Sequence, residues 1–276
     1  MTTTADYPLH PDAEVQDANI ARIYDYYLGG LYNFAIDREK AERIKSMLPS
    51  VDLLARANRD WLRRSVRYLM GEGIRQFIDL ASGLPTAGNT HEVAHAIDPR
   101  ARVVYVDNEP TAVRHGNDIL AGEPFAAMAG VDGKDARQVW AHPAVQELID
   151  RDQPIGVVMG GLLVFVQDHE DPAGVVAAYR DALVSGSFIA ISHLSVDTAD
   201  AQTCEQVDRM IAAYRAGVNA NLYTRDKATF TSWFDGMQLV EPGVTLMADW
   251  RPTPGQDVDA QTPSRQLGYG ATGRIV

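Results

Sequence analysis

Short apolar runs alternate with helical stretches between residues 75 and 195, at roughly 25–30 residues per unit. Such alternation of strand and helix predicts a parallel sheet with helices on both faces. The run VVYV at 103–106 is apolar on both sides, which is typical of a strand covered from both faces. The expected strands lie within residues 75–83, 102–110, 124–133, 154–165 and 187–195.

The C-terminal part of the sequence departs from this alternation. Two extended segments, 238–250 and 267–276, are joined by a loop rich in Pro, Asp and Gln, with no helix between them. This arrangement predicts an antiparallel pair at the edge of the sheet. The expected fold class is α/β, with a mostly parallel sheet of about seven strands that ends in an antiparallel hairpin.

The first 72 residues contain no run that resembles a strand. Residues 1–16 are predicted to form a flexible arm, and residues 17–72 a helical extension that precedes a sheet domain at 73–276. Asp17 and Asp37 are candidate N-caps of the first two helices. The expected helices of the extension cover residues 17–28, 37–48 and 51–70.

Composition restricts the partners of the chain. With 25 Lys and Arg against 37 Asp and Glu, the formal net charge is −12. Nucleic-acid binding and attachment to anionic membranes both rely on clustered positive charge, so neither is expected. A lone cysteine, Cys204, excludes an internal disulfide and a cysteine zinc cluster. We expect a cytoplasmic protein without a signal peptide. The sequence leaves open whether the chain forms a homo-oligomer.

Acidic and small residues follow the expected strands. Ligands of open α/β sheets bind beyond the carboxyl ends of the strands, so these residues are candidates for a binding site. They are Asp79, Ala81 and Gly83 after the first strand, Asp107 and Asn108 after the second, Asp132 after the third and Gly160 after the fourth.

Asp107 stands where a carboxylate can accept hydrogen bonds from both ribose hydroxyls of a nucleoside cofactor. It can equally cap the helix that begins at Pro110. The loop after the first strand lacks G-x-G-x-x-G, and Pro85 has no N–H to offer a phosphate, so a nucleoside without phosphates fits better than a dinucleotide. Asp79 can hold an ammonium group or can serve to cap the end of the strand.

Three stretches carry a resemblance to a known family: NIARIYDYYLGGLYNFAIDREKAERI, QFIDLASGLPTAGNTHEVA and GYGATGRIV. Over residues 17–276 the sequence resembles the actinobacterial S-adenosylmethionine-dependent methyltransferases once known only as a domain of unknown function. The resemblance implies a Rossmann-like class I methyltransferase fold with an N-terminal helical extension. Ala81-Ser82-Gly83 departs from the G-x-G triplet that is common in this fold.

The resemblance also assigns roles to residues. It implies that Asp79 and Gly83 line the methionine end of S-adenosylmethionine, Asp107 the ribose, Asp132 the adenine amino group, and Gly160 the floor. With Ala81, Asn108 and Tyr27 these residues make up the predicted cofactor site. The expected function is methyl transfer from S-adenosylmethionine to a small-molecule acceptor, with the acceptor unknown; a non-catalytic S-adenosylmethionine-binding regulatory protein is the alternative.

Two histidines are candidates for a general base near the acceptor. His193 ends the fifth strand and His169 follows the fourth. A base with a pKa near 7 helps when the acceptor is a hydroxyl, but each histidine is also explained as an ordinary polar loop residue. Asn58 and Arg59 on the third helix can reach a carboxylate or lie on a solvated face.

His91-Glu92-Val93-Ala94-His95 matches the H-E-x-x-H motif of zinc hydrolases. The G-x-x-H continuation is absent, because position 98 is Asp and position 101 is Ala. A zinc hydrolase is therefore an alternative that we do not favour, and no metal is expected.

Aromatic residues are dense around Gly29-Gly30. They either pack the helical extension on the sheet or form a lid, since a sulfonium cation can lie against aromatic faces. The residues concerned are Tyr24, Tyr26, Tyr27, Tyr32 and Phe34.

Overall fold

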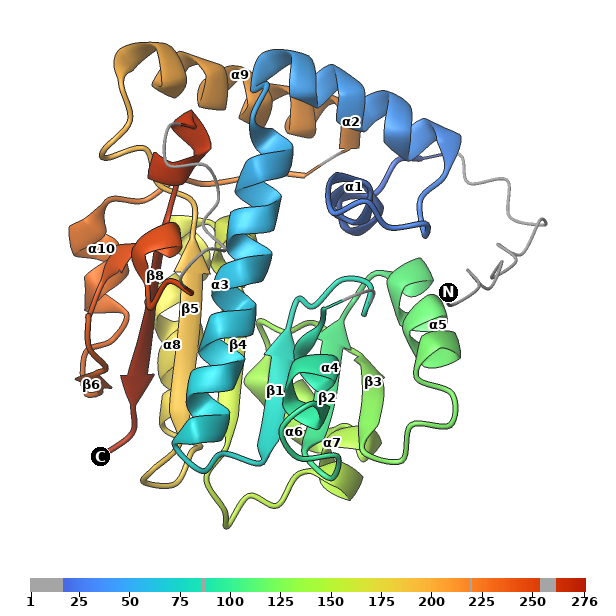
Figure 1. Cartoon of the computed structure of the whole chain (residues 1–276), viewed down its shortest axis with the longest axis vertical. Helices are drawn as coiled ribbons and strands as arrows, with labels where there is room; N and C mark the ends of the chain where they lie inside the picture. Colours follow the sequence, from blue (N-terminus) through green and yellow to red (C-terminus); the bar gives the residue numbers. More distant parts are fainter. Residues whose placement is uncertain (1–16, 86–87, 219, 254–261) are drawn as a thin grey trace.

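The computed structural model describes residues 17–85, 88–218, 220–253 and 262–276, so the predicted arm at 1–16 lies outside the described residues. The sheet has the order β3-β2-β1-β4-β5-β8-β6, with β7 also paired to β8 (Figure 1). The strands are β1 (Gln76–Leu80), β2 (Arg102–Asp107), β3 (Ala126–Gly130), β4 (Gly156–Gly160), β5 (Phe188–His193), β6 (Gln238–Leu239), β7 (Thr245–Leu246) and β8 (Tyr269–Arg274).

Strands β1 to β5 are parallel and β8 is antiparallel to β5, as the sequence predicted. The expected strand at 238–250 is two short strands instead, β6 and β7, which both pair with β8. Pro242 lacks the N–H that a ladder needs, and Gly243 adopts a positive φ of 77°. Pairing with β8 is therefore interrupted between β6 and β7. The sheet therefore has eight strands rather than about seven.

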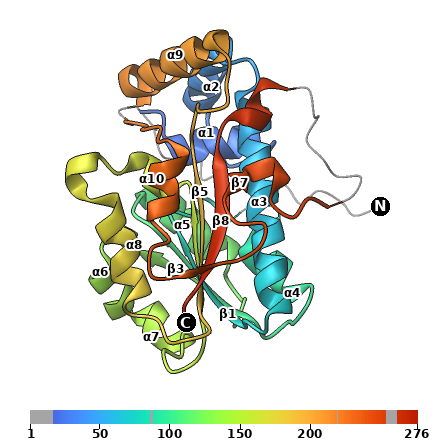
Figure 2. The same cartoon turned by 90° about the vertical axis from the view of Figure 1, so that its left-hand side faces the viewer.

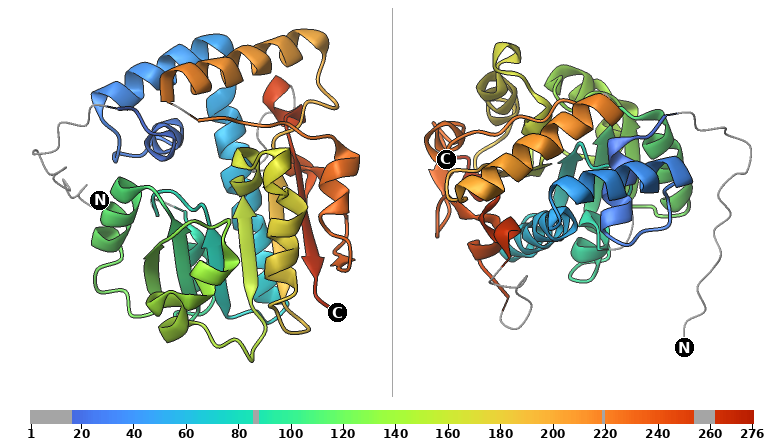
Figure 3. Two further views of the ribbon diagram at one scale, coloured as in Figure 1. Left: turned by 180° about the vertical axis from the view of Figure 1, so that it is seen from behind. Right: turned by 90° about the horizontal axis from the view of Figure 1, so that it is seen from above.

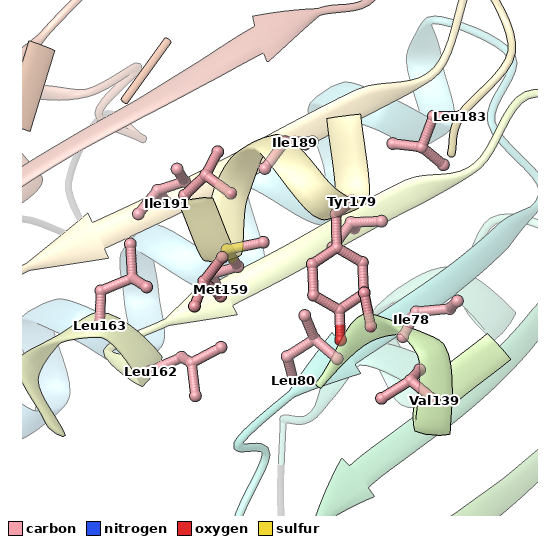
Figure 4. Close-up of a cluster of buried hydrophobic side chains, with 14 of the residues drawn as sticks. Ile78, Leu80, Val139, Met159, Leu162, Leu163, Tyr179, Leu183, Ile189 and Ile191 are labelled. Atoms are coloured by element: carbon pink, nitrogen blue, oxygen red, sulfur yellow. The ribbon is translucent and has the colours of Figure 1, made fainter. Parts of the chain in front are cut away.

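Alternate residues of the parallel strands pack against opposite helical layers. On one face Phe77, Val103 and Val158 contact α3 and α4. On the other, Ile78, Val157 and Ile189 lie among side chains from α6, α7, α8 and α10. Figure 2 shows these four helices on one side of the sheet, and Figure 4 shows Ile78 and Ile189 near Tyr179 of α8. The helices are α3 (Val51–Gly71), α4 (Thr90–His95), α5 (Pro110–Ile119), α6 (Ala136–Ala141), α7 (Pro143–Leu148), α8 (Pro172–Arg180) and α10 (Lys227–Ser232).

Three further helices form a roof over the carboxyl ends of the parallel strands: α1 (Ile20–Tyr27), α2 (Ala35–Met47) and α9 (Ala201–Val218). Helices α2 and α9 run side by side across the top of the molecule (Figure 3). Their shared core includes Ile44, Leu48, Val207 and Met210. We call α1, α2 and α9 the roof helices. In the sequence α1 and α2 precede the first strand and α9 follows the fifth, but all three helices share one apolar cluster.

The helix starts differ from the sequence prediction. Asn19, not Asp17, caps α1, since its side chain accepts a hydrogen bond from the Ala21 N–H at 2.7 Å. Helix α2 begins at Ala35, and Asp37 lies within its first turn, where it accepts from the Phe34 N–H at 2.9 Å. No helix in the described ranges combines the length and apolar character that membrane crossing requires.

Candidate active site

A cavity of about 880 Å³ lies between the sheet and the roof helices. Its lining falls into two parts. The strand-end half consists of lining residues from the ends of β1, β2 and β4 and from the segments that follow β1, β2, β3 and β4. The helical half consists of lining residues from α1, α3, α9 and the end of β5, together with residues 220–222, Met247 and Leu267. The cavity thus joins the polar edge of the sheet to a space walled by helices.

The loop after β1 has the backbone of a tight turn. Ala81 has a φ of 52° and Gly83 a φ of 63°, both in the left-handed region. That region costs an alanine roughly 1 kcal/mol more than a glycine. The Ser82 N–H bonds the Val106 carbonyl at 3.2 Å, which ties the turn to β2. Ala81 therefore occupies a conformation for which glycine is the usual residue, so the departure from G-x-G leaves the turn in place.

The Asp107 carboxylate is oriented by backbone donors. Its Oδ2 accepts from the Gly83 N–H at 2.8 Å and its Oδ1 from the Glu109 N–H at 2.9 Å. Burial raises the pKa of Asp107, and these hydrogen bonds oppose the rise. Glu109, not Asp107, caps α5, because its side chain accepts from Ala112. The helix-cap explanation of Asp107 is thereby corrected, and its carboxylate lines the cavity.

Asp79 is 2% exposed and lines the same half of the cavity. Its Oδ2 accepts from the Thr90 hydroxyl at 2.6 Å. Burial raises the pKa of Asp79 to about 6, while the Thr90 hydrogen bond and the nearby Arg59 charge act in the opposite direction. At neutral pH the group is mainly ionised, which provides a buried anion at the floor of the site.

The remaining predicted residues of the strand-end half also line the cavity: Asn108, Asp132 and Gly160. Asp132 accepts from the Lys134 N–H at 2.9 Å, and Lys134 in turn pairs with Glu170 at 2.8 Å. A Cβ at Gly160 would lie 3.5 Å from Leu62 Cδ1, so α3 already stands in contact distance of this floor.

Tyr27 requires a correction. Its ring is buried in the roof, its hydroxyl donates to the Ala41 carbonyl at 3.0 Å, and it is absent from the cavity lining. Tyr24 faces the cavity instead. The Tyr24 hydroxyl donates to the Ala55 carbonyl at 3.0 Å and accepts from Asn58 Nδ2 at 3.0 Å. The density of tyrosines was visible in the sequence, but the rotation of α1 about its axis was not.

His193 and His169 have different surroundings. His193 lines the cavity at 2% exposure, and Arg225 Nη1 donates to its Nε2 at 3.4 Å. Burial, and next the Arg225 charge, lower the pKa of His193 to about 3, so the imidazole is neutral at physiological pH. His169 is exposed on the short helix Asp168–Glu170 and does not line the cavity. The structure does not bring the two histidines together.

The H-E-x-x-H pair is engaged in hydrogen bonds of the fold. His91 Nδ1 lies 2.7 Å from the Tyr105 hydroxyl, and His95 Nε2 lies 2.8 Å from the Ala101 carbonyl. Within the described part of the chain, no group of three His, Cys, Asp or Glu residues is placed to hold a metal ion. The geometry does not favour the zinc hydrolase.

The helical half contains residues that sequence reasoning missed. Met210 and Tyr214 of α9 line it, together with Leu222. Helix α9 follows β5, the last parallel strand, after a short connection. No motif marks them, because their apolar character alone is shared with any packed helix. Asn58 and Arg59, whose role the sequence left open, both line the cavity.

Comparisons with known proteins agree with this geometry. Residues 8–276 match the S-adenosyl methyltransferase family. A candidate methyltransferase from Thermobifida fusca YX is 37% identical, with a TM-score of 0.87 over 96% of this chain and 97% of its own. A DUF574 family protein from Streptomyces avermitilis is 32% identical, with a TM-score of 0.88 over 95% and 98%. No functionally curated protein matches the chain.

The strand order, the helical extension and the acidic residues at the strand ends are those expected of a class I methyltransferase, and the family match extends over nearly all of the sequence. The chain therefore belongs to the S-adenosyl methyltransferase family and is an S-adenosylmethionine-dependent methyltransferase.

Proposed function

We propose that the strand-end half of the cavity holds S-adenosylmethionine and that the helical half holds a small-molecule methyl acceptor. The observation that carries this proposal is the continuity of the two halves in one cavity of about 880 Å³ under the roof helices. When bound, S-adenosylmethionine supplies a methyl group already activated by a sulfonium. The protein then has to align donor and acceptor and exclude water.

The residues of the strand-end half fit this cofactor. Asp107, held by two backbone donors, has lone pairs left to accept from ribose hydroxyls. Asp79 is a buried anion that suits the ammonium of the methionine end. Asp132 is proposed to accept from the adenine amino group. Ala81, Gly83, Asn108 and Gly160 line the space between these groups.

The helical half favours a part of the acceptor that is largely apolar and carries no positive charge. None of its described lining residues is acidic, whereas Asp79, Asp107, Glu109, Asp132 and Glu170 all belong to the strand-end half. Three of its polar groups form a chain: the Ser192 hydroxyl donates to Asn58 Oδ1 at 2.6 Å, and Asn58 Nδ2 donates to the Tyr24 hydroxyl at 3.0 Å. This chain is proposed to orient the acceptor by hydrogen bonds.

We assign His193 an orienting role rather than that of a general base. With a pKa of about 3, its imidazole holds a proton too weakly to serve an acceptor of ordinary acidity at neutral pH. His169 points to solvent and is not part of the proposed reaction. The acceptor atom is therefore proposed to be nucleophilic without deprotonation by a histidine.

The proposed setting is the cytoplasm, with no nucleic-acid partner. The formal net charge of −12 suits a small molecule better than a polyanion.

The decisive experiment offers the protein trideuteromethyl-labelled S-adenosylmethionine and a fractionated small-molecule extract. Mass spectrometry then searches for a product that carries the added label, with S-adenosylhomocysteine released in equal amount. Asp107→Ala is the control and should reduce both signals when the cofactor is kept below the wild-type dissociation constant. Tight cofactor binding without any labelled product would favour the regulatory protein instead.

A further inference from the structure

Arg59 is a buried cation without an acidic partner in the described part of the chain. Arg59 is 5% exposed and lines the cavity. Its Nη1 donates to the side-chain oxygen of Asn89, and its Nε has no hydrogen-bond partner. Among the described residues no carboxylate lies within ion-pair distance of it. A buried guanidinium in this state is incompletely satisfied, and an anionic ligand would complete it.

The position of the guanidinium is set before any ligand arrives. Asn89, which is 1% exposed, accepts from Nη1 on one side. The Tyr24 ring lies under the guanidinium, with 5.6 Å from Cζ to the ring centroid. An arginine held between an amide and an aromatic face presents a planar fork of donors, which matches the two oxygens of a carboxylate.

Asp79 adds the opposite charge beside it. Its hydrogen bond goes to Thr90 and not to Arg59, yet the Arg59 charge lowers the pKa of Asp79 against the effect of burial. The cavity therefore presents a cation and an anion that are near each other but not paired. An α-amino acid group carries a carboxylate and an ammonium on one carbon, in complementary positions.

We propose that Arg59, positioned by Asn89 and Tyr24, binds the carboxylate of an α-amino acid group whose ammonium faces Asp79. Two molecules can present this group: the methionine end of the cofactor, and an amino-acid acceptor. The inference rests on the proposed function of the cavity and adds to it the residue that recognises the carboxylate.

The test compares Arg59→Gln and Arg59→Lys with Arg67→Gln, which removes an exposed charge from the same helix. Isothermal titration measures S-adenosylhomocysteine and 5′-methylthioadenosine, which keeps the nucleoside and sulfur but lacks the amino acid group. If the cofactor supplies the carboxylate, Arg59→Gln weakens S-adenosylhomocysteine about 10- to 100-fold, as expected for a hydrogen bond to a charged group. 5′-Methylthioadenosine then binds as in the wild type, Arg59→Lys keeps part of the affinity, and Arg67→Gln changes nothing.

A second experiment tests whether the acceptor supplies the carboxylate. The protein is saturated with S-adenosylhomocysteine, and L-phenylalanine and its carboxamide are titrated while amide chemical shifts are recorded. If the acceptor supplies the carboxylate, Arg59→Gln leaves the affinity for S-adenosylhomocysteine unchanged. The wild type then binds L-phenylalanine but not its carboxamide, and Arg59→Gln does not bind L-phenylalanine.

The proposal is overturned if Arg59→Gln changes the affinity for neither S-adenosylhomocysteine nor L-phenylalanine, or if it weakens 5′-methylthioadenosine as much as S-adenosylhomocysteine. Thermal unfolding of each variant verifies that the fold is kept. Failure of the proposed function looks different, because the wild type itself would then bind neither nucleoside.

Discussion

Arg22 of α1 and Glu109 at the start of α5 face each other across the edge of the cavity, with 3.7 Å between Nη1 and Oε1. Arg22 also pairs with Asp37 of α2 at 2.8 Å, and both of these side chains are almost fully buried. Glu109 is two residues past Asp107. The Arg22 side chain thus connects the roof helices to the sheet edge that carries Asp107, the residue proposed to bind the ribose.

Glu109→Gln is expected to loosen this tie while sparing the fold. Glutamine keeps an oxygen for the α5 cap, and the buried pair of Arg22 with Asp37 stays intact. A partly exposed ion pair contributes up to about 1 kcal/mol, so the dissociation rate of S-adenosylhomocysteine should rise about two- to fivefold in stopped-flow measurements. Asp118→Asn, an exposed charge on the same helix, is the control. Equal rates for the two variants would show that the pair does not hold the roof.

Asp107→Ala should weaken S-adenosylhomocysteine by about 1–3 kcal/mol, the effect of losing charge-assisted hydrogen bonds. 5′-Methylthioadenosine should weaken equally, because it contains the same ribose. Calorimetric titration checks both ligands, and Asp181→Ala, an exposed carboxylate, is the matched control. Unchanged affinity for the two nucleosides would remove Asp107 from the ribose site.

Cofactor affinity should fall with acid because of Asp79. The pKa of Asp79 is raised to about 6 in the folded protein from 3.8. The folded state therefore binds more protons than the unfolded one between these values, and this group's contribution to stability decreases as pH rises through that window. Binding of an ammonium needs the ionised form, so affinity should decline as pH falls below about 6.

Titrations with S-adenosylhomocysteine between pH 5 and 7.5 test this dependence. Asp79→Asn should bind weakly across the whole range and show a flatter profile than the wild type. A wild-type profile as flat as that of the variant would contradict a role for the Asp79 charge.

His193 should stay neutral far into the acid range. Burial and Arg225 lower the pKa of His193 to about 3, so its imidazole protons should not titrate between pH 8 and 5 in nuclear magnetic resonance spectra. His193→Gln identifies the signal by its disappearance. A midpoint near 6.5 would restore His193 as a candidate general base.

The parallel half of the fold was predictable because its signal is local. Runs such as 103–106 are β-branched and apolar on both faces, and helices of ordinary length separate them. The interruption of pairing between Gln238–Leu239 and Thr245–Leu246 was harder to foresee, because it depends on how Pro242 meets the ladder of a strand some 30 residues away.

The candidate site divides in the same way. Asp79 and Asp107 lie where the sequence placed them, because a strand end is a defined position in this architecture. Tyr24 and Tyr27 could not be told apart, because residues three positions apart lie near one face of a helix and the sequence does not determine how that face is rotated relative to the cavity. The wall formed by Met210 and Tyr214 depends on the tertiary docking of α9 and has no local signature.

The roof helices have a consequence for how such a scaffold can diversify. Asp79, Asp107 and Asp132, which are proposed to hold the donor, lie at the strand ends, whereas Met210 and Tyr214 of α9 line the half proposed to meet the acceptor. Exchange of α9 between relatives would replace Met210 and Tyr214 without touching Asp79 or Asp107. With the two halves assigned as proposed, acceptor choice is modular, and a chimera that carries a foreign α9 is expected to keep its donor while acquiring another specificity.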